Sequence, residues 1–187
     1  NRLYRVEVHA GSASSKLTFK WSRDNGSVVF PVTIDKVEGS SSQGYKSRII
    51  LKQPAKDADL SLHVNDWVEI SGEQTELDCV PGTMAQVAGE SDGTNISKGI
   101  IVLKADLTKY VSQSYAKVRR WDQKEATGVT LVDGAVPVTF DKWVALEDGV
   151  EVCFKSGTYH SGDYWMIPAR TRTPHVLWDG PEFQDRH

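Results

Sequence analysis

The sequence predicts an all-β fold: a sandwich or a partly open barrel of short antiparallel strands, with at most one short helix. About a dozen short runs of alternating apolar and polar residues recur at intervals of roughly 8–15 residues, which is typical of sandwiches and barrels. Asx–Gly pairs such as Asp133–Gly134 and Asp148–Gly149 lie between several of these runs and favour tight hairpin turns. Long helical segments between strands, which would indicate a doubly wound α/β sheet, are absent. Periodicity does not encode strand order, so sandwich and barrel both stay open.

The segment from residue 17 to residue 34, LTFKWSRDNGSVVFPVTI, predicts a β-hairpin. Leu17, Phe19 and Trp21 alternate with polar residues, as they would in a half-buried strand. Residues 24–26, Asp-Asn-Gly, tolerate the positive φ angles of a tight turn. The return strand, residues 28–34, places its apolar side chains on one face. We therefore expect these two strands to pair with each other.

The remaining strands are predicted from the same alternation and from the turn residues between them. They cover residues 3–8, 47–51, 66–70, 84–88, 99–104, 118–121, 129–132, 136–140, 143–146, 150–154 and 163–167. A helix is predicted over residues 106–116, where apolar residues fall at helical spacing behind Asp106 as the N-cap. Its β-branched and Ser residues limit this helix to a turn or two.

The length of 187 residues fits one domain. We expect a single all-β domain over residues 1–167, with a subdivision near residues 105–116 as the alternative. Residues 168–187 are rich in Pro, Arg and acidic side chains, which predicts an irregular C-terminal segment. The chain starts at Asn1 without Met and enters a strand-like run directly, which favours a fragment of a longer polypeptide.

Composition and charge argue against two classes of partner, nucleic acids and membranes. The net charge of −3 provides no basic field for nucleic acid, so no nucleic-acid partner is expected. No apolar run approaches the ~20 residues of a transmembrane helix, so no membrane insertion is expected. Cys79 and Cys153 are expected to be separate thiols, with a single disulfide as the alternative.

Motifs that would indicate a known chemistry are missing. The sequence contains no GxSxG, HExxH, P-loop or GxGxxG pattern, and its five His residues lack the spacing of metal ligands. We therefore expect no zinc, no cofactor and no enzymatic activity. The acidic turns, including Asp92, Asp133 and Asp148, are expected to be hairpin turns. A surface calcium ion held between two such loops is the alternative.

Tryptophan supplies the candidate ligand-binding residues. The chain has six Trp, and Trp21, Trp121 and Trp165 stand in short groups that contain Arg or Asp. A sugar or peptide site would use such a group as a stacking platform with charged neighbours, whereas aromatic residues in strands commonly pack in a core. Both interpretations stay open. The candidate residues are Trp21, Arg23, Arg119, Arg120, Trp121, Asp163, Tyr164, Trp165 and Arg170.

Several phrases in the chain resemble a known family. They are NRLYRVEVH (1–9), TFKWSRDNGSVV (18–29), VRRWD (118–122), LEDGVEV (146–152) and SGDYWMIPARTRT (161–173). In this order they are similar to an uncharacterised family of bacterial domains, some of which occur in proteins associated with phage-tail-like contractile injection particles. The resemblance implies a domain inside a longer polypeptide. It carries over no catalytic residue.

Together these observations lead us to expect a non-enzymatic structural or binding module of a larger bacterial surface or phage-tail-like assembly. Its partners would be other domains of the parent polypeptide or other subunits, and its location the bacterial surface or a particle. The alternative is a carbohydrate-binding or carbohydrate-processing module that uses exposed Trp residues. A homo-oligomeric shell piece held by exposed aromatic strands is a third hypothesis.

Overall fold

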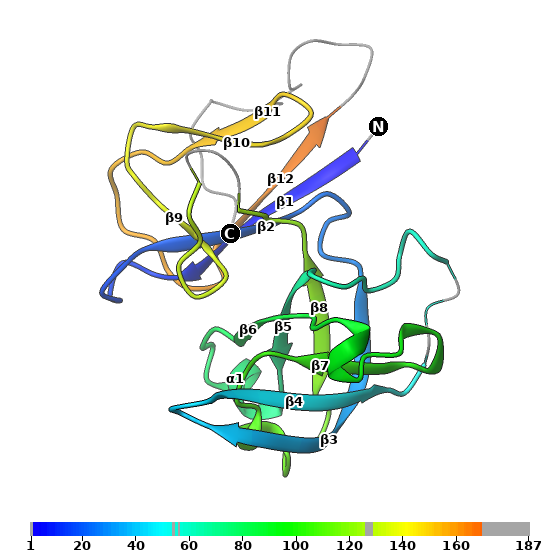
Figure 1. Ribbon diagram of the computed structural model, residues 1–187. Coiled ribbons are helices and arrows are strands. Elements are labelled where there is room, and N and C mark those ends of the chain that lie inside the picture. Colours follow the sequence, from blue (N-terminus) through cyan, green and yellow to red (C-terminus); the bar gives the residue numbers. More distant parts are fainter. Residues whose placement is uncertain (1, 54, 56, 126–128, 170–187) are drawn as a thin grey trace. The chain divides into compact units, whose positions relative to one another are not determined.

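The computed structural model describes residues 2–53, 55, 57–125 and 129–169 (Figure 1). These residues are almost entirely antiparallel strands and loops with short helical turns, which confirms the all-β prediction. The chain forms two compact units: Asn1–Gly26 together with Asp122–His187, here called the sheet unit, and Ser27–Trp121, here called the barrel unit. The polypeptide therefore passes between the two units twice, after Gly26 and after Trp121.

The sheet unit contains a four-stranded antiparallel sheet and a separate hairpin. The sheet has the order β12-β1-β2-β9, and the hairpin pairs β10 with β11. The strands are β1 (Arg2–Ala10), β2 (Thr18–Ser22), β9 (Val136–Pro137), β10 (Trp143–Glu147), β11 (Val150–Cys153) and β12 (Tyr164–Ala169). β12 extends through Pro168 and Ala169, and residues 170–187 of the predicted irregular segment lie outside the described residues.

Strand alternation divides this sheet into an apolar face and a polar face. Val6 on β1 lies opposite Trp21 on β2 and Trp165 on β12, so these three residues share one face. That face packs into a core with the inward side of the hairpin. On the other face Glu7 lies opposite Lys20 and Tyr164. The period of two in the sequence thus separates the core from a row of ionisable side chains.

The barrel unit is one six-stranded antiparallel sheet that curls back on itself. Its order is β6-β5-β8-β3-β4-β7, and a bridge between Val87 and Leu103 joins its two ends. The amide of Ala88 also donates to the carbonyl of Val102 at 2.8 Å across this seam. Its elements are β3 (Val29–Ser40), β4 (Gly44–Leu51), β5 (Trp67–Ser71), α1 (Glu73–Leu77), β6 (Thr83–Gln86), β7 (Ile100–Leu103), β8 (Lys117–Trp121), and the 3₁₀ turns Glu90–Asp92, Ile96–Lys98 and Thr108–Tyr110.

Inward-facing aliphatic residues fill the barrel. Val28, Phe30, Val32 and Ile34 are all buried, as their alternation predicted. β3, which carries three of these residues, changes partners along its length. It pairs with β8 at Val29–Pro31 and with β4 from Val32 onward, with a register shift between Ile34 and Lys36.

The predicted hairpin over residues 17–34 is wrong. β2 pairs with β1 and β9 in the sheet unit, whereas β3 pairs with β8 and β4 in the barrel unit. The turn itself exists, because Asn25 and Gly26 have φ angles of 53° and 64°. Turn residues reverse the direction of the chain locally, but they do not determine whether the two flanking strands pair with each other. β2 is also buried on both faces rather than half-buried.

The predicted helix over residues 106–116 is reduced to the 3₁₀ turn Thr108–Tyr110. Leu107 and Tyr110 are buried, but Val111 and Tyr115 are exposed, and Tyr115 has a φ of 59°, which no α-helix accommodates. The short helix α1 was not predicted. The strand predicted over residues 129–132 is reduced to isolated bridge positions, and the strand predicted over residues 136–140 shortens to β9.

A first prediction concerns the hairpin between β3 and β4. Gly39 has a φ of +106°, and a Cβ there would overlap the carbonyl oxygen of Gly44, whereas Gly44 (φ +79°) has open space around the same position. We expect Gly39→Ala to lower the free energy of unfolding by about 3 kcal/mol and Gly44→Ala by only about 1 kcal/mol. Urea titration of both variants measures the difference. Equal effects would contradict the steric explanation.

Candidate functional site

The predicted ligand-binding residues fall in both units. Trp21, Arg23, Asp163, Tyr164 and Trp165 belong to the sheet unit. Residues 119–121 belong to the barrel unit, and residue 170 (Arg170) lies outside the described residues. Each group is therefore described in its own unit.

The tryptophans of these groups face inward to different degrees. Trp21 and Trp121 have only 4% and 1% of their surface exposed, and Trp165 is half-buried. Trp165 packs edge-on against the ring of Phe154, with ring centroids 5.7 Å apart. A ligand cannot stack on Trp21 or Trp121 in this conformation. Trp21 is part of the apolar core of the sheet unit, whereas Trp121 lies outside the core cluster of the barrel unit and donates its indole N–H to Glu69.

Arg23 is the centre of a polar cluster in the sheet unit. Its Nη2 lies 2.7 Å from Oε2 of Glu147, and its Nε lies 3.5 Å from Oδ1 of Asp122. Its backbone amide donates to Oδ2 of Asp122 at 2.9 Å. The hydroxyl of Tyr4 donates to Oε1 of Glu147 at 3.0 Å. The cluster therefore ties β1, the end of β2 and β10 to the segment that returns from the barrel unit.

The environment of Tyr4 makes its hydroxyl a poor acid. Burial, the hydrogen bond to Glu147 and the negative charges of Glu147 and Asp148 raise the pKa of Tyr4 to about 12 from its usual 10.0. The phenol thus stays protonated and keeps donating to the carboxylate at neutral pH. This arrangement suits a structural contact.

Arg120 and Trp121 make contacts inside the barrel unit. The indole Nε1 of Trp121 donates to Oε2 of Glu69 at 3.0 Å, and Oε1 of the same carboxylate accepts from the amide of Gly82. Arg120 donates to the carbonyl oxygens of Asp59 and Ser61 at 3.0 and 2.5 Å, which holds the loop before β5. These side chains thus anchor loops to the barrel wall.

Arg119, Asp163 and Tyr164 are more accessible. The guanidinium of Arg119 lies 5.9 Å from the ring centroid of Trp121. The carboxylate of Asp163 accepts from the amide of His160 at 2.7 Å and so closes the turn before β12. Tyr164 is exposed, and the guanidinium of Arg5 stacks 3.7 Å from its ring centroid. Of the predicted residues, Tyr164 is the aromatic one that presents an exposed ring.

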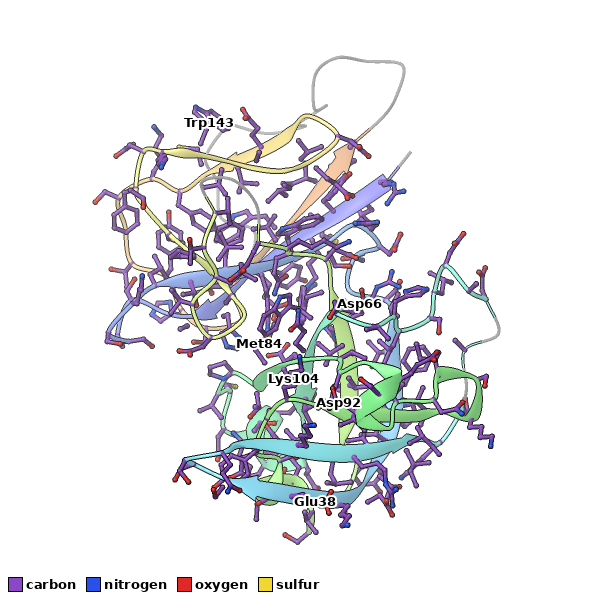
Figure 2. All side chains as sticks on the ribbon, in the orientation of Figure 1. Glu38, Asp66, Met84, Asp92, Lys104 and Trp143 are labelled. Carbon is purple, nitrogen blue, oxygen red and sulfur yellow. The ribbon has the colours of Figure 1, made fainter. Side chains whose placement is uncertain are left out.

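Trp143 is exposed and was not among the predicted site residues. It has 65% of its surface exposed, and Figure 2 shows its side chain on the β10–β11 hairpin, pointing away from the sheet. The sequence contained the relevant pattern: Val144 and Leu146 pack into the core, so Trp143, one position earlier, must face the opposite way. Its cross-strand neighbour is Cys153.

A cleft of about 610 Å³ lies on the barrel unit, at the tip of the β3–β4 hairpin. Strand residues, a 3₁₀ turn and the residue after β7 line it: Glu38, Gly39, Gln43, Gly44, Tyr45, Lys46, Asp92 and Lys104. The sequence did not predict this cleft, because its charged residues are far apart in the chain. We call it the Tyr45 cleft.

A second groove of about 780 Å³ is lined by residues from two loops of the barrel unit, including Asp57, Ser61, Glu90 and Asn95. Within the described ranges no group of three or more His, Cys, Asp or Glu side chains is placed to hold a metal ion. Cys79, in the barrel unit, and Cys153, in the sheet unit, are both free thiols in this structure. No helix among the described residues is long and apolar enough to cross a membrane.

A second prediction follows from the Tyr4 contact. Because the folded state holds the pKa of Tyr4 above its unfolded value, this stabilisation is present below pH 10 and is lost as the pH rises toward 12. We expect Tyr4→Phe to cost about 1–2 kcal/mol at pH 7 and to flatten the loss of stability above pH 10. Chemical unfolding at several pH values measures both effects. Tyr45→Phe is the control, and an unchanged alkaline profile in Tyr4→Phe would contradict the assignment.

Comparison with known proteins adds a family but no relative of known activity. Residues 1–183 match the model of a family described as a family of unknown function, DUF6519. No curated protein and no solved structure matches the chain. With nearly the whole chain covered, this protein belongs to the DUF6519 family.

Proposed function

We propose that the chain is a non-enzymatic binding module that docks onto another domain of its parent polypeptide or another subunit of a larger bacterial surface or phage-tail-like assembly. The observation that carries this proposal is an exposed apolar surface on the polar face of the four-stranded sheet, at its β12 edge. It consists of Leu3, Tyr164 and Met166, and we call it the β12 patch.

The register of the sheet brings these residues together. Tyr164 lies opposite Glu7, Met166 opposite Arg5, and Leu3 opposite Pro168. All of these residues occupy the same face, because opposite residues in an antiparallel pair point the same way and alternate residues share a side. The patch is therefore continuous across two strands.

The composition of the β12 patch suits a protein partner. Tyr, Met and Arg are enriched in the cores of protein interfaces. Arg5 already stacks on Tyr164 and forms an ion pair with Glu7 at 2.6 Å, so both the ring and the guanidinium are held in place before any partner binds. Holding an anchor residue rigid lowers the entropy lost on association.

The edge of the sheet supports the same conclusion. Among the described residues β12 pairs with β1 alone, so its other edge presents backbone groups that an added strand could use. Pro168 lies in this strand, and proline is tolerated at sheet edges. The resemblance of several sequence phrases to domains of injection-particle proteins supports an assembly as the setting.

A third prediction tests the β12 patch. Met166→Lys should weaken association with the neighbouring domain of the parent polypeptide at least tenfold, because it places a charge in an apolar contact. Sedimentation velocity of the chain alone and mixed with that domain provides the measurement. The matched control is Leu77→Lys, which changes an exposed apolar residue on α1 of the barrel unit.

Full retention of affinity by Met166→Lys would contradict docking at this patch. Hydrolysis or elimination of a polysaccharide by the purified chain, with saturable kinetics, would contradict the non-enzymatic assignment. Self-association that Met166→Lys abolishes would identify a second copy of the chain as the partner subunit.

A second candidate function, carbohydrate binding, is favoured by the exposure of Trp143. An exposed indole offers a flat apolar face on which the C–H groups of a sugar ring can stack. The same face of the hairpin carries Ala145 and Glu151, which lie opposite each other. The small Ala145 leaves space beside the ring, and Glu151 provides a hydrogen-bond acceptor for hydroxyl groups.

A fourth prediction tests Trp143. Wild-type protein titrated with a panel of bacterial polysaccharides should show saturable binding in calorimetry, and Trp143→Ala should weaken it about tenfold or more, a loss that matches one stacked ring. Tyr115→Ala removes an even more exposed aromatic residue, from the barrel unit, and is the control. Equal affinity in all three proteins would remove Trp143 as a sugar platform.

A further inference from the structure

We propose that the Tyr45 cleft binds a carboxylate-bearing sugar, such as a uronic acid residue of an acidic glycan, with Lys104 as the group that pairs with the carboxylate. The site lies in the barrel unit and differs from both the β12 patch and Trp143. The proposal therefore goes beyond the docking function and does not rest on it.

Strand register places the charged side chains of the cleft in one row. Glu38 on β3 lies opposite Lys46 on β4. Ser47, the next residue on β4, lies opposite Leu103 on β7, so Lys104 comes beside Lys46 one step further along the antiparallel pair. Figure 2 shows Lys104 and Asp92 close together on this side of the barrel.

The ion pairs around the cleft leave one positive charge without a counterpart. Glu38 pairs with Lys36, and Asp92 pairs with Lys46. Lys104 has no hydrogen-bond or ion-pair partner for its ammonium group among the described residues. It lies close enough to Asp92 to influence that carboxylate. The cleft therefore has room for one further negative charge.

The ionisation state of Asp92 supports this pairing of the charges around the cleft. The hydrogen bond from Lys46 and its positive charge hold the pKa of Asp92 below its usual value, and Lys104 adds to the effect. Asp92 is thus ionised at neutral pH and forms its ion pair with Lys46. Lys104 is left to bind an external anion.

The mixture of charges favours a sugar acid over a phosphate. A dianionic phosphate placed beside Lys104 would also be repelled by the carboxylates of Asp92 and Glu38. A uronic acid has a single negative charge, and its hydroxyl groups can donate to those same carboxylates. The cleft volume of about 610 Å³ accommodates a sugar ring.

Backbone and amide groups of the cleft fit the rest of the sugar ring. Gly44 has no atom within 4 Å of the position a Cβ would take, so a ligand can approach the backbone there. Gln43 adds an amide that donates and accepts.

The fifth prediction uses three probes: methyl glucuronide, methyl glucoside and inorganic phosphate. Calorimetry should show saturable binding of the glucuronide and at least fivefold weaker binding of the other two. Lys104→Gln should raise the Kd for the glucuronide about tenfold, since it removes a charge-assisted hydrogen bond. Lys98→Gln, an exposed Lys elsewhere in the barrel unit, should have no effect.

Four results would overturn the proposal. Equal affinity for the glucuronide and the glucoside would show that the carboxylate is not recognised. Tighter binding of phosphate would identify a general anion site. Unchanged affinity in Lys104→Gln, with a thermal unfolding midpoint equal to that of wild type, would place the ligand elsewhere. If Trp143→Ala alone abolished glucuronide binding, the sugar site would be the hairpin and the cleft assignment would fail.

Discussion

The ion pairs of Glu7 allow the central strand of the sheet unit to be buried on both sides. Lys20 lies between Phe19 and Trp21 on β2, and its side chain is almost completely buried. An unpaired ammonium group in such a place costs several kcal/mol. Oε1 of Glu7 lies 3.1 Å from Nζ of Lys20, and Arg5 pairs with Oε2 of the same carboxylate. This carboxylate therefore offsets much of the cost of burying a lysine at the centre of β2.

The sequence predicted most strands because alternation is a local property. β1, β5, β7, β8, β10, β11 and β12 lie close to their predicted positions. β10 and β12 alternate between more and less exposed residues, whereas β5 and β7 are buried at consecutive positions and were found from their apolar runs and flanking turn residues. Pairing is not local. Asp24 to Gly26 form a turn, yet β3 does not pair with β2. It belongs to the barrel unit, where Phe30, near its first residue, pairs with Val118 of β8. That contact joins residues far apart in the chain, and no local pattern contains it.

The candidate site residues show a similar limit, because the sequence pattern does not tell which Trp and Arg side chains are exposed. Composition draws attention to groups of Trp and Arg, but such groups serve a core as well as a ligand. Trp121 donates to Glu69, and Arg120 holds backbone carbonyls, so both satisfy their polar atoms internally. Exposure separates the two roles, and exposure follows from tertiary packing. For Trp143 alternation against Val144 and Leu146 was sufficient to assign the outward face, whereas the Tyr45 cleft depends on Lys46 and Lys104 meeting across paired strands.

The two proposed surfaces differ in the physical basis of recognition. The β12 patch would gain affinity mainly by removing apolar area from water, a contribution that salt changes little. The Tyr45 cleft would gain it from an exposed ammonium and a carboxylate, which are screened once the Debye length of ~10 Å at 0.1 M salt shortens to ~3 Å at 1 M. Raising the salt concentration should therefore release a sugar acid from Lys104 while a protein partner stays bound through Met166. Salt dependence therefore distinguishes the proposed recognition of a sugar acid at Lys104 from the proposed docking of a protein at Met166.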